Sequence, residues 1–224
     1  MHIPDGYLGP PTYGVLWAAT AAIWYRASVN VKKTLKASEI PLLALSASFS
    51  FVVMMFNIPI PGGTTGHATG ATLIAVLIGP WAAALSVSIA LVIQALIFGD
   101  GGITAIGANC FNIAIAETLA GYALYRVLSK GNASSKRRLF AAGAGAYIGI
   151  NTAAFLTAVE LGIQTVLHVA PDGRPLYGPF PLAITVPAIM AEHIVLFGFI
   201  EAVVTVLALA YIERSHPELL KAKK

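Results

Sequence analysis

Residues 40–99 read IPLLALSASFSFVVMMFNIPIPGGTTGHATGATLIAVLIGPWAAALSVSIALVIQALIFG, sixty consecutive residues without an Asp, Glu, Lys or Arg. A second uncharged run lies between Asp5 and Arg26. In an ordinary soluble domain about 25% of the residues carry charge, so uncharged runs of this length are not expected there. Long apolar runs without charge are typical of helices that lie in lipid. The stretch therefore predicts a membrane protein.

The composition of the whole chain agrees with a membrane location. Of its 224 residues, 57% are hydrophobic and 11% are charged, and the mean hydropathy is +0.78. Disorder is excluded, because disordered segments need low hydrophobicity. The net charge of +4 does not indicate a nucleic-acid surface, because the basic residues lie between apolar runs. A single cysteine, Cys110, excludes an internal disulfide and a cysteine-cluster metal site.

Pro, Gly and charged residues divide the chain into seven apolar segments. We expect one transmembrane domain (1–224) with an outward N-terminal segment (1–7), spans at 8–30, 40–57, 67–79, 80–98, 105–129, 137–168 and 181–212, and a cytoplasmic tail (213–224). A spanning helix needs about 20 residues, so the third segment is too short to cross alone. Its Gly66, Gly70 and Gly79, followed by Pro80, predict a half-helix buried inside the bundle, where a site can lie. The predicted fold class is an all-α polytopic membrane protein, a seven-helix bundle.

The basic residues predict the orientation of these spans. With the N-terminus outside and the C-terminus cytoplasmic, all of the fourteen Lys and Arg residues except Arg174 fall on the cytoplasmic side. They are Arg26, Lys32, Lys33 and Lys36 after the first span, Arg126, Lys130, Lys136, Arg137 and Arg138 after the fifth, and Arg214, Lys221, Lys223 and Lys224 after the seventh. This asymmetry supports the seven-span count, since merging the third and fourth spans would break it.

The first two residues, Met1 and His2, offer three nitrogen donors to a metal ion. They are the α-amine, the His2 backbone nitrogen once deprotonated, and the His2 imidazole, which short chelate rings join. We expect Met1 to be retained, because His2 is bulky and no signal peptide is recognisable before the first span. A deprotonated amide in a plane of nitrogens favours Ni(II) or Cu(II). The ordinary pKa values of the amine and imidazole, about 8 and about 6.5, allow both to be free of protons near neutral pH.

His67 is the natural fourth donor. Pro59, Pro61, Gly62 and Gly63 predict a loop on the outer face that leads directly into it, on the same side as the N-terminus. The alternative is that His2 is an inert terminal residue and that His67 is a polar residue satisfied within the bundle. Placement on one face favours the metal interpretation for both histidines together, so we predict Met1, His2 and His67 as ligands.

Other ionisable residues in apolar stretches are candidates for function by default. His193 follows Glu192, but the pattern lacks the second histidine of H-E-x-x-H, so structural pairing is the favoured interpretation. Glu117, Glu160 and Glu201 are costly in lipid unless paired or protonated. Hydrogen bonding to Asn, Thr, Tyr or backbone groups is favoured for them over proton relay.

Several polar residues are candidates to orient the other ring nitrogen of His67, as metal-bound histidines generally require. They are Asn57, Thr64, Thr65, Gln94, Asn109, Asn112 and Asn151. Asp100, in the glycine-rich turn 98–107, either caps the fifth helix or braces the N-terminal residues, and capping is favoured. The turn lacks the Lys of a phosphate-binding loop, so no nucleotide is expected there. His168 and His216 are expected to be interfacial and solvated.

Three motifs carry a family resemblance. Met1–Leu8 (MHIPDGYL), Asn57–His67 (NIPIPGGTTGH) and Phe98–Asn109 (FGDGGITAIGAN) occur in this order. Together they resemble the NikM/CbiM family, the substrate-capture S components of energy-coupling-factor (ECF) transporters for nickel and cobalt. The resemblance runs through most of the chain, although the C-terminal half matches mainly in character. Glu192, His193 and Glu201 therefore inherit no role from it.

The resemblance implies a seven-helix S component whose outer N-terminus inserts into the bundle. It implies that the Met1 amine, the amide and imidazole nitrogens of His2, and the His67 imidazole hold the ion. It further implies partners, namely a transmembrane coupling (T) protein, a pair of cytoplasmic ATPases and often a small accessory membrane protein. ATP hydrolysis then belongs to the partners, in agreement with the lack of a Walker motif in this chain.

The sequence thus predicts an S component in a prokaryotic cytoplasmic (inner) membrane that captures Ni(II) outside and delivers it inward. Ni(II) is the transported substrate, Co(II) is the alternative, and no organic cofactor is expected. Nickel is preferred because a nitrogen plane with a deprotonated amide suits it better than Co(II). A membrane-embedded metalloenzyme is disfavoured, since it needs an open coordination position and a nearby general base. A stand-alone secondary transporter is disfavoured because no internal repeat is apparent.

Overall fold

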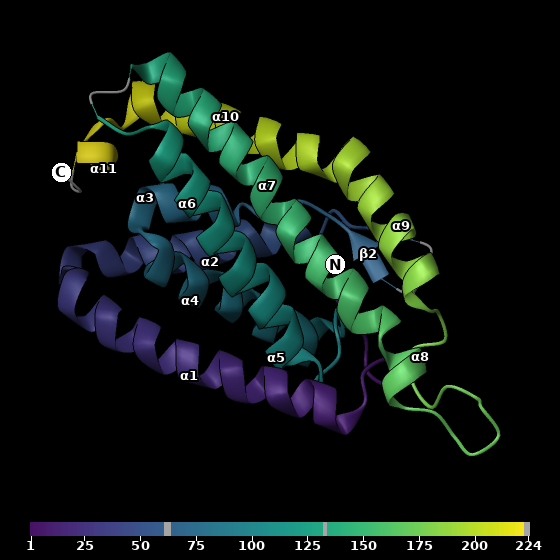
Figure 1. Ribbon diagram of the computed structural model, residues 1–224. Coiled ribbons are helices and arrows are strands. Elements are labelled where there is room, and N and C mark those ends of the chain that lie inside the picture. The colour runs from purple at the N-terminus through teal and green to yellow at the C-terminus, as the bar shows by residue number, and fades with distance from the viewer. Residues whose placement is uncertain (61–63, 132–133, 222–224) are drawn as a thin grey trace.

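The computed structural model describes residues 1–60, 64–131 and 134–221, and it is mostly helical (Figure 1). The helical character agrees with the fold class that the apolar runs predict. The α-helices are α1 (Pro10–Thr34), α2 (Ile40–Met54), α3 (Ala71–Ile78), α4 (Pro80–Ile93), α5 (Ile106–Asn109), α6 (Thr118–Leu128), α7 (Ser135–Gly162), α8 (Gln164–Leu167), α9 (Leu182–Glu192), α10 (Gly198–Ser215) and α11 (Glu218–Lys221). A short 3₁₀ helix, Ala37–Glu39, precedes α2.

Three π-helical stretches extend or join these helices. Gln94–Phe98 continues α4, Cys110–Glu117 joins α5 to α6, and His193–Phe197 joins α9 to α10. A π-helical turn is wider than an α-helical turn, and such turns are frequent at functional sites. Each stretch therefore changes which side chains a long helix directs toward the interior.

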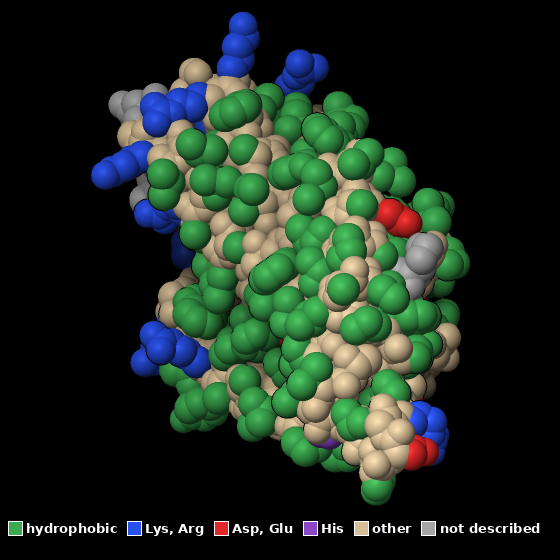
Figure 2. All heavy atoms as spheres, turned by 45° about the vertical axis from the view of Figure 1, so that its right-hand side comes forward, with side chains coloured by type: hydrophobic (Ala, Val, Ile, Leu, Met, Phe, Trp, Pro, Cys, Tyr) green, Lys and Arg blue, Asp and Glu red, His purple; other side chains and the backbone are tan. Residues whose placement is uncertain are grey.

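Within the described residues, three helical runs have the length and apolar composition of membrane-crossing helices. They are Pro80–Phe98, Ser135–Leu167 and Leu182–Ser215. Large hydrophobic side chains stand exposed on these runs, with Ile97 and Val195 each 72% accessible. Figure 2 shows hydrophobic side chains spread over one side of the molecule and many Lys and Arg side chains gathered toward one end. Exposed apolar surface of this extent marks contact with another apolar phase, which for such helices is lipid.

Helix α3 is short and lies inside the bundle. Its residues are buried except for Val76, which is partly exposed, and it packs against α4, α6, α7 and α10. Gly70, with φ of 72°, precedes the helix, and Gly79, with φ of 85°, ends it. Eight residues extend only about 12 Å, less than the apolar thickness of a bilayer. The helix starts at Ala71 rather than at residue 67, because the left-handed conformation of Gly70 cannot continue a helix toward the N-terminus.

A small β-hairpin departs from the all-α expectation. Strands β1 (Ile58–Ile60) and β2 (Thr64–Gly66) pair antiparallel, with Ile58 opposite Gly66 and Ile60 opposite Thr64. The sequence predicted only a loop here, because strands of three residues with Pro59 in the middle lack the alternation by which a strand is recognised. Pro61, Gly62 and Gly63 lie outside the described residues. The hairpin presents His67 directly after its second strand.

Close glycine contacts hold α6 against α7. A Cβ atom on Gly145 of α7 would lie 2.5 Å from the carbonyl oxygen of Gly121 on α6. The two backbones therefore approach more closely than any larger residue allows, as small residues permit between membrane helices.

Gly145→Ala is expected to lower the free energy of unfolding by about 1–3 kcal/mol, because the added methyl group pushes α6 away from α7. Thermal unfolding in detergent measures the change. Gly14→Ala on α1 is the matched control, since nothing lies within 4 Å of its added Cβ. Alanine is a better helix former than glycine, so the control keeps or gains stability. Equal melting temperatures for the two variants would contradict the close contact.

Candidate metal-binding site

The N-terminal segment enters the interior of the bundle. Met1 and Ile3 are fully buried, and His2 is 3% exposed. Figure 1 shows the N-terminus in the middle of the fold, near β2 and α7. A chain end in this position brings its amine and backbone amides out of water, so each of these polar groups needs a partner.

Asn109, at the end of α5, holds Ile3 through both of its carboxamide atoms. Its Oδ1 accepts from the Ile3 backbone N–H at 2.8 Å, and its Nδ2 donates to the Ile3 carbonyl at 3.1 Å. The Thr64 hydroxyl donates to the His2 carbonyl at 2.9 Å, and the Gly102 N–H donates to the Ile3 carbonyl at 2.9 Å. The backbone of residues 2 and 3 is thus fixed by a helix, a strand and a turn.

Asp5 ties the same segment to the glycine-rich turn. Its carboxylate accepts from the backbone N–H groups of Ile103 at 3.0 Å and Thr104 at 2.8 Å. Partial burial raises the pKa of Asp5, but the hydrogen bonds from Thr104 and Ile103 outweigh it and hold the pKa below its ordinary value. Gly102 packs so closely that a Cβ atom there would lie 2.6 Å from Asp5 Oδ1.

His2 and His67 lie ring against ring. Their ring centroids are 4.6 Å apart, with an angle of 34° between the planes. His67 is fully buried, and its Nδ1 donates to the Ala68 carbonyl at 3.1 Å. Because a carbonyl only accepts, Nε2 of His67 carries the lone pair. Neither this Nε2 nor that of His2 has a hydrogen-bond partner among the described residues.

The Met1 amine lies beside the same strand. It donates to the Thr65 carbonyl and lies 3.3 Å from the Thr65 hydroxyl. Burial lowers the pKa of this amine from its ordinary value of 8.0 to about 4, although the Asp100 charge opposes the shift. Burial also lowers the pKa of His2, although the hydrogen bond that the His2 ring donates to Asp100 opposes the shift. Both groups therefore keep an unprotonated nitrogen near neutral pH.

Asp100 braces the N-terminal residues and does not cap α5, so the favoured interpretation from sequence was wrong. Its Oδ1 lies 2.8 Å from His2 Nδ1, and its Oδ2 accepts from Asn57 Nδ2 at 3.1 Å. Helix α5 begins only at Ile106, too far along the chain from Asp100 for a capping hydrogen bond.

A backbone carbonyl, that of Ala68, orients His67, and none of the polar side chains proposed from sequence does so among the described residues. Asn109 was among those candidates, but its carboxamide holds Ile3. Sequence reasoning missed both contacts, because they depend on the path of the chain end and on the turn after β2. The described residues include no cluster of three or more His, Cys, Asp or Glu side chains suited to a metal. A site here must rely on terminal and backbone nitrogens as well.

Comparisons with known proteins identify the family. The family model described as the cobalt uptake substrate-specific transmembrane region, CbiM, matches residues 2–219. The chain belongs to the CbiM family. It is 49% identical, over all of its length and 65% of the relative, to a fused nickel transport protein NikMN of Rhodobacter capsulatus. It is 43% identical to a putative metal transport protein of Methanocaldococcus jannaschii, over all of this chain and 96% of that one.

A solved structure shares the fold. The crystal structure of a truncated transition metal transporter superposes with a TM-score of 0.90 at 46% identity, covering 95% of this chain and 98% of that one. The chain spans about two thirds of the length of the fused nickel transport protein. This chain is therefore a membrane protein of the CbiM family, and the relatives reported above are named as nickel or metal transport proteins.

The buried carboxylates of this CbiM-family chain are hydrogen-bonded, as predicted. Glu201 on α10 accepts from the backbone N–H groups of Thr69 at 2.7 Å and Gly70 at 2.9 Å. The Thr69 hydroxyl donates to Glu117, and Asn112 donates to Glu160 at 2.8 Å. A carboxylate at the start of α3 also meets the positive end of the helix dipole. Glu201 thus anchors the turn that carries His67.

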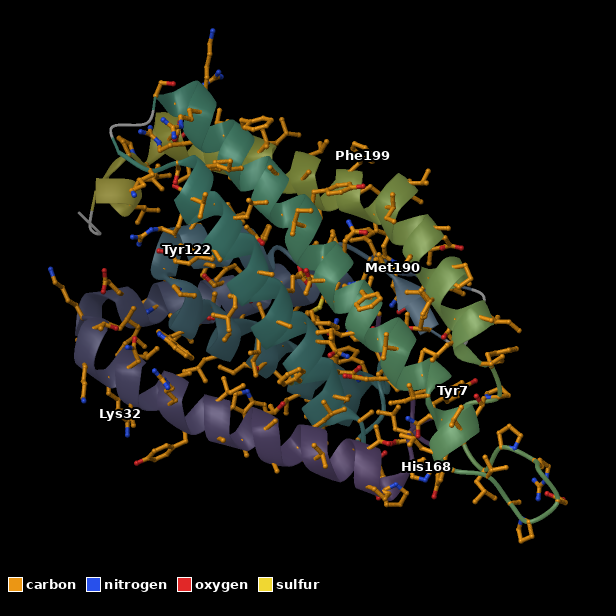
Figure 3. The ribbon with its side chains drawn as sticks, in the orientation of Figure 1. Tyr7, Lys32, Tyr122, His168, Met190 and Phe199 are labelled. Carbon is orange, nitrogen blue, oxygen red and sulfur yellow. The ribbon has the colours of Figure 1, made fainter. Side chains whose placement is uncertain are left out.

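His168 directly follows α8, away from the paired imidazoles. Its Nε2 lies 3.3 Å from the Thr12 hydroxyl, and its ring packs against Tyr177. Figure 3 labels His168 and Tyr7 at this end of the molecule. The structure does not bring His168 together with His2 and His67.

Asn109→Ala is expected to release the N-terminal segment, because two buried hydrogen bonds to Ile3 are lost at about 1–3 kcal/mol for each group left unsatisfied. Hydrogen exchange of the amides of residues 2–9 measures the release and should accelerate at least tenfold, if about 1.4 kcal/mol is lost. Asn112→Ala is the control, since this buried amide contacts Glu160 instead. Equal exchange in both variants would show that Asn109 does not hold the segment.

Proposed function

We propose that this chain is the substrate-capture S component of an ATP-driven ECF importer, which takes Ni(II) from outside the cell and delivers it across a prokaryotic cytoplasmic membrane. The observation that carries the proposal is the buried arrangement of the Met1 amine, His2 and His67. Three unprotonated nitrogens and one backbone amide come together there, and no acidic or sulfur ligand is needed. The names of the relatives support nickel and cobalt as the substrate class.

The proposed ligands are the Met1 amine, the deprotonated backbone amide of His2, Nδ1 of His2 and Nε2 of His67. This ligand set uses the α-amine of Met1, so the proposal takes Met1 as the N-terminal residue of the functional protein. The chelate ring that joins the His2 amide to its own imidazole closes through Nδ1, which here faces Asp100. Binding therefore requires the His2 ring to turn about its Cβ–Cγ bond. The turn alone leaves the proton on Nδ1, so the ring must also change tautomer, losing the proton at Nδ1 and gaining one at Nε2. The Nε2–H can then donate a hydrogen bond to Asp100.

Nickel is the proposed substrate, and Co(II) is the alternative within the same family. Four nitrogens in one plane, one of them a deprotonated amide, suit the square-planar geometry of Ni(II). The buried N-terminal backbone adds selectivity for this geometry, because its hydrogen bonds with Asn109 and Thr64 limit how far the backbone ligands can move.

The proposed topology has seven crossings, with residues 1–7 outside and the tail after residue 212 in the cytoplasm. It places the Lys and Arg residues on the cytoplasmic side apart from Arg174. The proposed partners are a transmembrane coupling protein, a pair of cytoplasmic ATPases and a small accessory membrane subunit. Nickel uptake by this chain without the ATPase pair would contradict this assignment and favour a stand-alone transporter.

One residue added before Met1 is expected to abolish high-affinity Ni(II) binding, because it displaces the amine from the site. His2→Ala should do the same, because it removes the imidazole. Calorimetric titration of the purified chain with Ni(II) measures both. The same residue added after Lys224 is the control and should leave the affinity unchanged. Normal binding by the N-terminally extended chain would rule out the proposed ligand set.

Nickel affinity is expected to fall about tenfold for each unit by which the pH is lowered between about pH 8 and about pH 6. In this range the Met1 amine, with its pKa of about 4, is already unprotonated, so only the amide proton of His2 is released. An amine of ordinary pKa would release a second proton and steepen the slope. Titrations in several buffers measure the number of protons released. An affinity independent of pH would exclude the amide as a ligand.

A further inference from the structure

A cavity of about 1010 Å³ lies where α3 ends inside the bundle. Val76, in the last turn of α3, is one of its lining residues, and other lining residues come from α6, α7 and α10. Pro217, and Leu220 on α11, line one side. Helix α3 stops at Ile78 after only eight residues, so it does not fill the space between the longer helices around it. The volume matches the upper end of the range for small-molecule sites, about 300–1,000 Å³.

The lining of this cavity is basic. Among the described lining residues are four cations and one carboxylate, namely Arg126, Lys130, Arg138, Arg214 and Glu213. We call this space the basic cavity. A cleft lined by charges of one sign concentrates ions of the opposite sign. The lining therefore favours an anionic ligand.

Glu213, the carboxylate of the described lining, is already engaged by its neighbours. Its Oε1 accepts from Nε of Arg138 at 2.9 Å, and its Oε2 accepts from the Ser135 hydroxyl. The other three cations form no ion pair with the described residues. Positive charge around the basic cavity is thus not compensated by the described parts of the chain. Because like charges repel, a bound anion stabilises this arrangement.

Aromatic rings hold Arg126 at the basic cavity. Its guanidinium lies over the Tyr122 ring, 5.9 Å from the centroid, and Nη1 donates to the Tyr122 hydroxyl at 3.4 Å. Tyr122 in turn packs against Tyr125, with centroids 6.1 Å apart. Figure 3 labels Tyr122 on the side of the molecule where α11 lies. A guanidinium offers several N–H donors, so Arg126 keeps most of them for an anion, and their planar arrangement suits phosphate oxygens.

Apolar side chains adjoin the basic lining. Val127, next to Arg126 in the chain, lines the basic cavity and is 69% exposed, and Leu139 lines it from α7. Phe140 and Tyr211, which follow lining residues in the chain, stand exposed on α7 and α10 at 69% and 65%. Exposed apolar side chains on membrane helices contact lipid. The basic cavity thus lies where charged donors meet the lipid-facing surface.

A phospholipid with a net negative charge matches both parts of this surface. Its phosphate offers oxygens to Arg and Lys, and its acyl chains cover the apolar side chains. Basic pockets between membrane helices bind the headgroups of anionic lipids. Inorganic phosphate offers the same oxygens but makes no contact with Val127 and its apolar neighbours. An acidic segment of a partner protein also offers negative charge, but lipid already surrounds the helices at this level.

We propose that the basic cavity is a binding site for the headgroup of an anionic phospholipid such as phosphatidylglycerol. The phosphate lies among Arg126, Lys130 and Arg214, and an acyl chain passes over Val127. The site is independent of the proposed metal ligands, and in the proposed topology it faces the cytoplasmic leaflet. A lipid bound there joins the ends of α6, α7 and α10, so it stabilises the folded chain.

Arg126→Gln combined with Arg214→Gln tests the proposal, because this double variant removes two cations from the basic cavity. Native mass spectrometry of the full chain in detergent measures how many molecules of phosphatidylglycerol bind and at what concentration. We expect the affinity to fall at least about tenfold, since each Lys or Arg near the headgroup adds to the attraction.

Lys32→Gln combined with Lys33→Gln is the matched control. It removes the same charge from the last turn of α1, outside the described lining of the basic cavity. Figure 3 labels Lys32 on α1, well apart from Tyr122. Because salt screens charges away from the site, the affinity of the control should stay within about twofold.

Two further probes separate the lipid from other ligands. Phosphatidylcholine with the same acyl chains carries no net charge and should bind at least about tenfold more weakly. Inorganic phosphate in large excess should leave the bound lipid in place, because it lacks the acyl contacts. Phosphatidylglycerol should also raise the melting temperature of the unaltered chain and of the control by more than that of the double variant.

Lys130→Gln provides a milder variant in case the double variant does not fold, since Lys130 is exposed and should weaken phosphatidylglycerol binding severalfold when changed. Equal affinity in the unaltered chain and in these variants would overturn the proposal. Equal affinity for the two lipids would overturn it as well, and displacement by inorganic phosphate would assign the basic cavity to a free anion instead. A chain that binds no phosphatidylglycerol would also overturn it and leave the cavity to an acidic partner segment.

Discussion

The burial of the N-terminal segment is the constraint on which the rest of the structure depends. An amine and several backbone amides have left water, and each needs a partner inside the bundle. Asn109, Thr64 and the glycine-rich turn supply these partners. Helix α5 and the hairpin must therefore sit around the segment, and the turn must approach it closely at Gly102. The positions of α5, the hairpin and the glycine-rich turn are therefore set by their contacts with the N-terminal segment as well as by the hydrophobic core.

The same burial produces the chemical character of the site. Loss of water lowers the pKa of the Met1 amine and leaves its nitrogen unprotonated. Loss of water also makes every unpaired polar group costly. Asp100 is accordingly hydrogen-bonded to His2, and Glu201 to the turn after His67. The Nε2 atoms of His2 and His67 are among the buried polar atoms that hydrogen bonding within the described residues leaves without a partner. Two imidazole nitrogens thus remain available as donors beside the buried chain end.

Much of the helical architecture and the candidate ligands could be predicted from sequence, and the contacts between them could not. Charge-free runs predict helices in lipid, and flanking glycines predict the short buried α3. The hairpin was missed because its strands are too short for a periodic pattern. The role of Asp100 was assigned to the wrong partner, because a local cap was preferred over a contact with residues almost a hundred positions away. Long-range pairing leaves no signal in local spacing.

The sequence by itself determined that the chain is a helical membrane protein and that Met1, His2 and His67 are the residues to consider. It did so because charge distribution, glycine placement and donor chemistry are properties of residue types along the chain. Only the tertiary structure decided that the rings of His2 and His67 lie against each other and that a carbonyl of the chain itself orients His67. These features depend on how a chain end and a hairpin meet in space, and hydrogen-bond satisfaction in a water-free interior selects that arrangement.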